Sequence, residues 1–230
     1  MATVFSRATS ERAGASRTRE ARTSPGWCDV PTVAALRPPD PGPILDGMTL
    51  VLREPWTVER FLAWEDKQEG RHEFDGLRIV EMTGGSRAHQ RIVLNLVRLL
   101  EDVLAPGRWD AVQEMRLELE GKVRYPDVAV VAGRIPNATK TLRDAVVLFE
   151  VLSEDTAPTD RHEKRAEYAG LPGIRRYVLL DQDRVAATVL ARVPEGWVEA
   201  GLTQGCLDLP ELGVSLPLAS IYRGLGFGSA

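Results

Sequence analysis

The clearest pattern in the sequence is a set of apolar residues that recur at intervals of three and four between positions 87 and 104. This spacing places them on one face of an amphipathic helix, with charged residues on the opposite face. Ser86 precedes the run as a suitable N-cap, and Pro106-Gly107 ends it. The pattern therefore predicts a long helix that packs one face on a core. Its apolar positions are Ile92, Val93, Leu96, Leu100, Val103 and Leu104.

Upstream of this helix, the sequence predicts a short helix followed by a β-hairpin. Thr57 is suited to cap a helix over 58–64, whose apolar side contains two aromatic residues. Two strand-like segments, 71–74 and 77–82, are then separated by Asp75-Gly76, a pair that favours a tight hairpin turn. We expect these elements to be an addition on the N-terminal side of the main fold.

Downstream of the long helix, the pattern changes from alternation to continuous apolar runs. Alternation over 115–120 predicts a strand with one wet face, and a turn at Gly121-Lys122 leads into 125–131 as its antiparallel partner. The apolar run over 145–152 predicts a strand that is buried on both faces. A helix over 160–170 and strands over 175–180, 185–192 and 197–202 complete the pattern.

From residue 87 onward, the predicted element order is helix, strand, strand, strand, helix, strand. This order is typical of an α/β architecture, in which helices cover the faces of a mixed central β-sheet. The N-terminal hairpin and the C-terminal strands would extend this core. We therefore expect residues 48–230 to form a single domain.

Residues 1–47 differ in composition from the rest of the chain, because they are rich in Arg, Ser, Thr, Ala and Pro and have no amphipathic period. A proline-rich stretch over 37–43 closes the segment, and neither a helix nor a central strand tolerates it. Such a segment cannot bury enough apolar surface to offset its ordering entropy. We expect a disordered leader, with Met48 as a candidate start. A targeting peptide is an alternative, although Glu11 and Glu20 disfavour it.

The composition excludes several classes of protein. The longest apolar runs, 128–132 and 145–149, are far shorter than the roughly 18 residues of a membrane-spanning helix. We therefore expect a cytoplasmic protein with no membrane partner. Cys28 and Cys206 have neither the spacing of a disulfide framework nor that of a zinc site. The net charge of −4 means that any nucleic-acid partner would have to bind a local basic patch.

Two carboxylates occupy positions in strands where an apolar interior disfavours charge. Asp127 follows Pro126 and precedes an apolar run, and Glu150 lies inside the most apolar strand. Carboxylates are rarely buried unless they are paired or bound to a cation. If the two strands are neighbours, Asp127 and Glu150 could share a hard divalent cation such as Mg²⁺. The alternative is that each residue reaches solvent or an arginine at a strand end.

The predicted helix after the second carboxylate carries Arg161, Lys164 and Tyr168 along one face. A cation on this face could stabilise a pentacovalent phosphate or align an attacking water. The alternative is a solvated basic face that Glu163 and Glu167 balance.

His89 lies in the first turn of the long helix, on the face that the apolar residues define. At a helix N-terminus beside a metal site, it could contact a phosphate. The alternative is a core histidine that hydrogen-bonds within the protein.

The order of these candidate residues along the predicted elements resembles that of the PD-(D/E)XK nuclease superfamily, and more narrowly that of its Uma-type family of restriction endonucleases. Pro126-Asp127 and Glu150-Val151-Leu152-Ser153 lie in the element order of the superfamily, and the next helix carries Asp160, Lys164 and Tyr168 as in the Uma-type family. The resemblance covers the chain from about Met48 to Tyr222, including an upstream segment with Glu73, Asp75-Gly76 and His89.

One departure concerns the lysine of the superfamily, which normally lies two residues after the glutamate. Leu152 occupies that position here. The resemblance implies that Lys164, on the following helix, takes over the role of this lysine.

The resemblance implies a restriction-endonuclease-like fold and a Mg²⁺-dependent endonuclease, with Mn²⁺ as a possible substitute, that hydrolyses DNA phosphodiester bonds. Asp127, Glu150 and Lys164 would be the catalytic residues. Asp127, Glu150 and the backbone carbonyl of Val151 would hold the metal, and Lys164 would orient or activate the water. The substrate phosphate would be contacted by His89, Arg161 and Tyr168, with Glu73 as an auxiliary residue.

The expected partners are a DNA substrate and a second copy of the chain, because nucleases that cut both strands commonly use two sites related by a two-fold axis. The alternative, from a different class, is a catalytically silent nuclease-fold module that acts in nucleic-acid binding or oligomerisation. The net charge of −4 favours this alternative, since non-specific DNA affinity arises mostly from the neutralisation of phosphates by basic residues. A small-molecule phosphate hydrolase that uses the same carboxylates is a third possibility.

Overall fold

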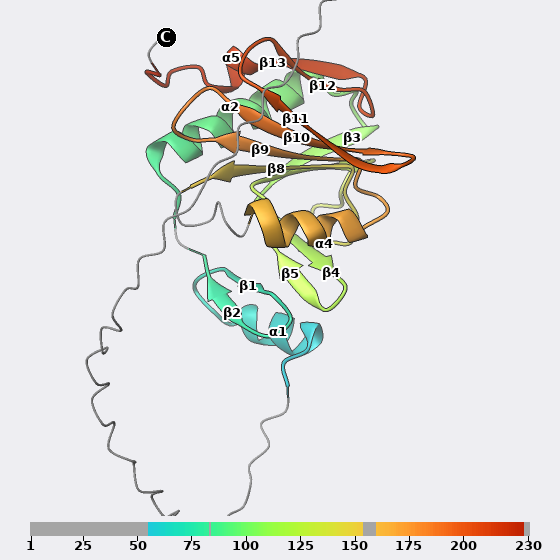
Figure 1. The fold of residues 1–230 in the computed structure, drawn as a ribbon. Helices are drawn as coiled ribbons and strands as arrows, with labels where there is room; N and C mark the ends of the chain where they lie inside the picture. The colour runs from blue at the N-terminus through green and yellow to red at the C-terminus, as the bar shows by residue number, and fades with distance from the viewer. Residues whose placement is uncertain (1–54, 83, 154–159, 228–230) are drawn as a thin grey trace, which may run out of the picture. The chain divides into compact units, whose positions relative to one another are not determined.

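The computed structural model describes residues 55–82, 84–153 and 160–227, except for the side chains of Asp160 and Arg161 (Figure 1). The predicted leader and the start at Met48 lie outside these residues and stay predictions. In the described part of the chain, no helix combines the length and the apolar character needed to cross a membrane. The helices are α1 (Val58–Glu65), α2 (Arg87–Val103), α4 (Arg165–Gly170) and α5 (Leu218–Ile221), and a π-helical segment, Asp160–Lys164, leads into α4.

A six-stranded mixed sheet forms the main layer, with the strand order β11-β10-β9-β8-β6-β3. β8 and β9 run parallel, and the other neighbouring pairs are antiparallel. This mixed sheet with flanking helices confirms the predicted α/β class. The strands are β3 (Trp109–Gln113), β6 (Val128–Ala132), β8 (Val147–Leu152), β9 (Arg176–Asp181), β10 (Ala187–Val193) and β11 (Gly196–Leu202).

The two faces of this sheet pack on different helices. Val128, Val147 and Phe149 contact the core that includes the apolar stripe of α2. Leu148 and Leu152, which alternate with them, join the core that α4 covers. In Figure 1, α2 and α4 lie on opposite faces of the sheet. β8 is buried along its whole length, which confirms the prediction from its continuous apolar sequence.

A second, five-stranded sheet has the order β2-β1-β5-β4-β7. Its β1 and β2 pair antiparallel, which confirms the predicted hairpin. Gly76 has a φ of +94°, a conformation that favours glycine, and the Asp75 carboxylate accepts the Leu77 and Arg78 N–H groups at 2.8 and 2.6 Å. The strands are β1 (His72–Phe74), β2 (Ile79–Glu81), β4 (Arg116–Leu119), β5 (Lys122–Arg124) and β7 (Thr141–Leu142).

Both predicted helix N-caps are confirmed. Thr57 Oγ1 accepts the Arg60 N–H at 3.2 Å at the start of α1. Ser86 Oγ accepts the His89 N–H at 3.1 Å at the start of α2. These bonds satisfy N–H groups that have no partner inside the helix, so they fix where each helix begins.

One predicted strand is wrong, because residues 125–131 do not form a single strand paired with 115–119. Pro126 lacks a backbone donor and interrupts the segment. Before it, β5 pairs with β4 in the five-stranded sheet. After it, β6 pairs with β3 and β8 in the six-stranded sheet. The proline therefore marks the point at which the chain passes from one sheet to the other.

The sequence pattern also missed β3 and the last elements of the chain. β3 contains Trp, Asp and Gln and is partly exposed at the sheet edge, so its sequence lacks a strong apolar pattern. The C-terminal segment forms a hairpin of β12 (Cys206–Leu209) and β13 (Val214–Pro217), followed by α5. Leu207, Leu209 and Leu216 of this hairpin are buried in the core on the α2 side.

Leu96→Ala should lower the free energy of unfolding by about 3 kcal/mol, because Leu96 is fully buried on α2 and its loss leaves a cavity in the main core. Chemical denaturation measures this change. Leu94→Ala, on the same helix, is the matched control, since Leu94 is 38% exposed and should change stability by less than about 0.5 kcal/mol. Equal effects of the two substitutions would contradict the position of α2.

Candidate active site

Asp127 and Glu150 meet at one end of the β6–β8 strand pair. The antiparallel register places Val128 opposite Phe149, so Asp127, which precedes β6, falls opposite Glu150. By alternation, both side chains lie on the α4 face, as those of Ala129 and Leu148 do. The backbone N–H of Asp127 also lies 3.4 Å from Glu150 Oε2. The predicted adjacency of the two strands is therefore confirmed.

The Asp127 carboxylate is oriented by two neighbours. The backbone N–H of Val151 donates to Asp127 Oδ2 at 2.6 Å. His89 Nε2 lies 3.1 Å from the same oxygen, and the side chains of His89 and Asp127 are only 14% and 13% exposed. His89 reaches this position because α2 begins next to the end of the sheet. It points toward the carboxylates, as the sequence predicts.

The Glu150 carboxylate accepts hydrogen bonds from α4 and from the π-helical segment that precedes it. Lys164 Nζ donates to Glu150 Oε1 at 3.1 Å, and the Tyr168 hydroxyl donates to the same oxygen at 3.3 Å. The four-residue spacing brings Lys164 and Tyr168 onto one helix face. The side chain of Lys164 is 7% exposed, so the alternative of a solvated basic face is wrong for this residue.

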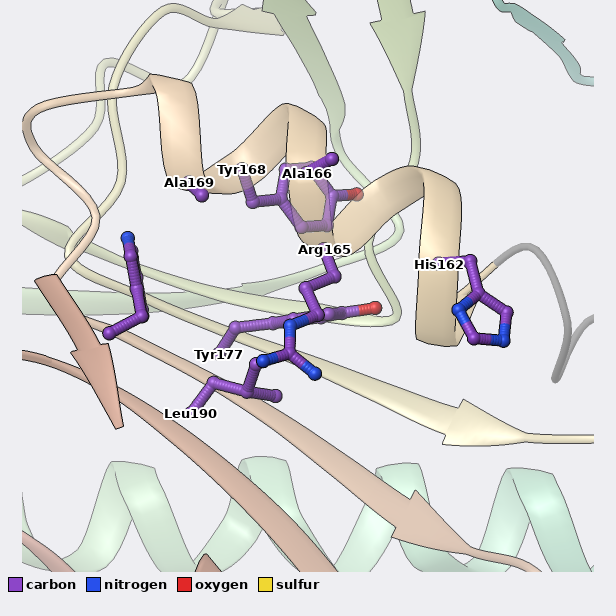
Figure 2. Close-up of a pocket in the computed structure, with 8 residues that line it drawn as sticks. His162, Arg165, Ala166, Tyr168, Ala169, Tyr177 and Leu190 are labelled. Carbon is purple, nitrogen blue, oxygen red and sulfur yellow. The ribbon is translucent and has the colours of Figure 1, made fainter. Parts of the chain in front are cut away.

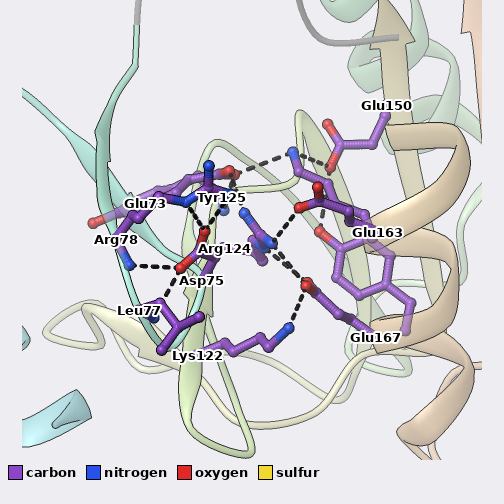
Figure 3. Close-up of polar contacts among 12 residues, drawn as sticks. Glu73, Asp75, Leu77, Arg78, Lys122, Arg124, Tyr125, Glu150, Glu163 and Glu167 are labelled. Atoms are coloured by element: carbon purple, nitrogen blue, oxygen red, sulfur yellow. Dashed lines mark hydrogen bonds and ion pairs between the residues drawn. The ribbon is translucent and has the colours of Figure 1, made fainter. Parts of the chain in front are cut away.

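Glu73 of β1 enters the same cluster from the five-stranded sheet (Figure 3). Its Oε1 lies 3.1 Å from Lys164 Nζ and accepts the Tyr125 N–H at 3.2 Å. Its Oε2 accepts Arg124 Nη1 at 3.1 Å. The ammonium of Lys164 is therefore held between two carboxylates, one from each sheet.

Arg124 is a residue of this cluster that the sequence analysis missed. Its side chain is 2% exposed and donates to both carboxylate oxygens of Glu167 on α4, at 2.7 and 2.8 Å (Figure 3). Lys122 Nζ adds a third bond to Glu167, at 2.7 Å. A signal was present in the sequence, since Arg124 lies between the apolar residues Val123 and Tyr125. The argument that selected Asp127, a charge inside an apolar strand, applies to Arg124 too.

The electrostatics of this pairing follow from burial and hydrogen bonding together. Burial tends to lower the pKa of the Arg124 guanidinium, but the bonds to Glu167 and the charge of Glu73 outweigh it and raise that pKa. Burial tends to raise the pKa of the Glu167 carboxyl. The hydrogen bonds from Arg124 and Lys122 outweigh burial and hold that pKa below its ordinary value of 4.5.

A cavity of about 790 Å³ opens over the two carboxylates. Its lining has more acidic than basic side chains, and Arg71, one of the basic ones, already pairs with Glu114. Such a lining attracts cations and repels an unaccompanied phosphate. The acidic residues are Glu73, Glu81, Glu114, Asp127, Glu150 and Asp183, and the basic side chains are Arg71 and Lys164.

The chemistry of these groups fits a hard divalent cation. Asp127 and Glu150 present carboxylate oxygens from adjacent strands, and Mg²⁺ typically binds one or two carboxylates and keeps several waters. Among the residues that the structure describes, no group of three or more His, Cys, Asp or Glu side chains forms a complete metal cage. The arrangement therefore fits a cation held by two carboxylates, with its remaining positions open to substrate and water.

The other predicted site residues have different outcomes. Val151 contributes its N–H to Asp127, and the role of its carbonyl as a metal ligand stays a prediction. The side chain of Arg161 lies outside the described residues, so its contact with phosphate is also still a prediction. Arg165, which follows Lys164 and was not predicted as a site residue, pairs with Glu199 of β11 at 2.6 Å.

Comparison with known proteins agrees with this fold. The family model Uma2, described as "Putative restriction endonuclease", matches residues 58–219. Two uncharacterized proteins of Synechocystis sp. are similar to the chain. For slr1290 the identity is 29%, over 74% of this chain and 92% of that protein. For sll1609 it is 30%, over 55% of this chain and 75% of that protein.

A solved structure from Anabaena variabilis, described as "a putative nuclease belonging to DUF820", aligns with a TM-score of 0.62. The alignment covers 73% of this chain and 98% of that chain, at 19% sequence identity. This likeness shows a shared fold of the restriction-endonuclease-like type. The match over 58–219 spans most of the sequence, and the chain belongs to the Uma2 family.

Glu167→Gln should lower the free energy of unfolding at pH 7 by about 3 kcal/mol, because it breaks a buried ion pair and leaves Arg124 without its bidentate partner. The folded-state pKa of Glu167 lies below the unfolded one, so its contribution is present above pH 4.5 and is lost as the pH falls through the folded pKa. The difference from wild type should therefore shrink in acid.

Urea unfolding from pH 7 to pH 3 measures this dependence. Glu120→Gln is the control, since Glu120 is an exposed residue next to β4 and should change stability little at any pH. A difference between Glu167→Gln and wild type that stays constant with pH would attribute the loss to packing, and not to charge.

Proposed function

We propose that the protein is a metal-dependent endonuclease that hydrolyses DNA phosphodiester bonds. The observation that carries this proposal is the position of Asp127 and Glu150 on one face of two adjacent strands, with the Lys164 ammonium 3.1 Å from Glu150. Phosphoryl transfer requires that the reactants be positioned and that the transition-state charge be stabilised. Two carboxylates and the buried Lys164 ammonium around an open cavity can supply both effects. Membership of a restriction endonuclease family supports the same reaction class.

In this proposal, Asp127 and Glu150 hold Mg²⁺ or Mn²⁺, and the carbonyl of Val151 is a third ligand. The bound cation would lower the pKa of a water and offset the charge of the phosphate. The Val151 N–H and His89 fix the orientation of the Asp127 carboxylate. Since the lining is acidic, we also propose that DNA binds only when divalent cations are present.

Lys164 is the proposed group that orients the attacking water and stabilises the transition-state charge. Its ammonium is held in place by Glu73 and Glu150, so little conformational entropy is lost when the substrate binds. His89, Arg161 and Tyr168 are the proposed phosphate contacts. Cleavage of both DNA strands would use two copies of the chain related by a two-fold axis, so we propose a homodimer.

The second candidate function is a catalytically silent nucleic-acid-binding module on the same fold. The observation that favours it is the pairing of Lys164 with two carboxylates, which neutralises the charge that would otherwise act on a phosphate. The two functions differ in whether the phosphodiester bond is broken, so a cleavage assay separates them.

Asp127→Asn and Glu150→Gln should each weaken divalent-cation binding by about tenfold or more, because each keeps the side-chain shape but removes a carboxylate charge. Isothermal titration with Mn²⁺ and Mg²⁺ measures the affinity, and circular dichroism verifies that the fold is retained. Asp102→Asn is the control, since Asp102 lies exposed on α2, outside the cavity lining. Wild-type affinity in both site variants would contradict the metal site.

Lys164→Ala should lower the rate of DNA cleavage by about 10²-fold while cation binding persists, because it removes a preorganised charge. Lys164→Met should lower the cleavage rate equally, because its side chain fills the space of the lysine but carries no charge. Lys164→Arg should restore little of the cleavage rate, since a planar guanidinium does not replace a compact ammonium. Lys140→Ala is the control, since the Lys140 side chain is 73% exposed.

Cleavage is measured with Mg²⁺ at low salt on duplex, single-stranded and branched DNA side by side. Equal rates for Lys164→Ala and wild type would remove Lys164 from the mechanism. If wild type cleaves none of the three forms while its cation and DNA binding persist, the binding-module function replaces the endonuclease.

A further inference from the structure

A second cavity, of about 390 Å³, lies between α4 and the strands β9, β10 and β11 (Figure 2). Ala166 and Ala169 of α4 line it, and their short side chains leave space above the sheet. Opposite them, the strands contribute Tyr177 and Trp197. The cavity therefore exists because small residues on the helix face large aromatic residues on the sheet.

Tyr168 joins this cavity to the candidate active site. Its ring lines the cavity, and its hydroxyl donates to Glu150 Oε1 at 3.3 Å. The ring also packs edge-on against Tyr177, with 5.0 Å between the ring centroids. The aromatic cavity and the carboxylate that we propose as a metal ligand are thus separated by a single side chain.

Two arginines lie at this cavity, and one of them is paired with a carboxylate. The Arg165 guanidinium extends over the cavity in Figure 2, and its ion pair with Glu199 holds it there. The guanidinium of Arg192 lies 4.6 Å from the centre of the Trp197 ring and donates to the carbonyls of Ala169 and Leu171. These contacts fix the Trp197 ring as one wall and place the Arg192 guanidinium beside it.

We propose that this cavity binds an unpaired nucleobase of the substrate strand, one nucleotide away from the phosphodiester bond at Glu150. The inference rests on the proposed endonuclease function and specifies its substrate as DNA with an unpaired base next to the cleaved bond. A nucleobase has flat apolar faces that stack on aromatic side chains, and its strand carries phosphates that a guanidinium attracts.

The size and position of the cavity support this ligand. Its volume of about 390 Å³ lies in the range of small-molecule sites, about 300–1,000 Å³, and exceeds what a bound water requires. The site is also on the same face of the sheet as Glu150, because Tyr177 and Leu148 belong to the core that α4 covers. Because Tyr168 and Tyr177 are themselves buried, the base would stack on the half-buried Trp197, and its strand would pass over Tyr168 to reach the carboxylates.

The test uses two fluorescent probes whose emission falls when the base stacks on an aromatic ring. The first is a single-stranded oligonucleotide that contains one 2-aminopurine and cleavage-resistant phosphorothioate linkages, titrated in Mg²⁺. The second is the neutral nucleoside of 2-aminopurine, titrated without metal, which does not depend on the phosphate site.

The fluorescence of both the single-stranded oligonucleotide and the free nucleoside should be quenched by wild type, and Trp197→Ala should weaken their binding by about tenfold, the size of one base–aromatic stack. Ala166→Leu, which fills the cavity without removing a contact, should have the same effect and covers the case in which Trp197→Ala fails to fold. Trp56→Ala is the matched control, since Trp56 packs on Trp64 and lies outside both cavities. Its quenching should equal that of wild type.

Each result separates the cavity from the nuclease function. Absence of quenching by wild type, or equal quenching by Trp197→Ala, Ala166→Leu and wild type, overturns the nucleobase site even if DNA is cleaved. Quenching that both cavity variants lose supports the site, and if wild type then cleaves no DNA, only the endonuclease function fails.

Discussion

The ion pairs of the Arg124 guanidinium are the interaction on which the arrangement of the site depends. Arg124 lies at the end of β5 in the smaller sheet and is bonded to Glu73 of the same sheet and to Glu167 of α4. A buried charge without partners would be strongly destabilising, so the smaller sheet and α4 must be held against each other. Since Glu73 also binds Lys164, this constraint reaches the proposed catalytic ammonium.

Pro126 explains how one short segment serves both sheets. It lies between Arg124, at the end of β5, and Asp127, which directly precedes β6. The residue that orders the smaller sheet and the residue that faces Glu150 are therefore only three positions apart. Movement of β5 would be transmitted to Asp127 through the chain itself, and to Lys164 through Glu73.

The sequence was sufficient to predict the parts of the fold that local patterns encode. The 3.6-residue period of α2, its Ser86 cap and the apolar run of β8 each depend on neighbouring residues, and all three are confirmed. The juxtaposition of Asp127 and Glu150 was predictable because two charges in apolar strands require a partner.

The remaining features depend on contacts between distant residues. β3 is an edge strand whose mixed sequence is stabilised by its pairing with β6, so no local signal marks it. Arg124 and Glu167 are 43 residues apart, and only the tertiary structure shows that they pair. The sequence pattern marks residues 125–131 as strand-like but does not say which strands they pair with. It therefore could not show that the segment is divided between two sheets.

The position of the proposed catalytic lysine on a helix has a consequence for how the protein loses activity. Leu152 occupies the strand position, two residues after Glu150, at which the PD-(D/E)XK superfamily normally has its lysine, and the Leu152 side chain is buried in the core. Lys164 directly precedes α4, a six-residue helix, so its ammonium reaches the sheet carboxylates Glu73 and Glu150 only while α4 is docked. Proteins open locally at a lower free energy than they unfold globally. Separation of α4 alone would dismantle the site while the sheet persists, so heat inactivation would precede the loss of secondary structure.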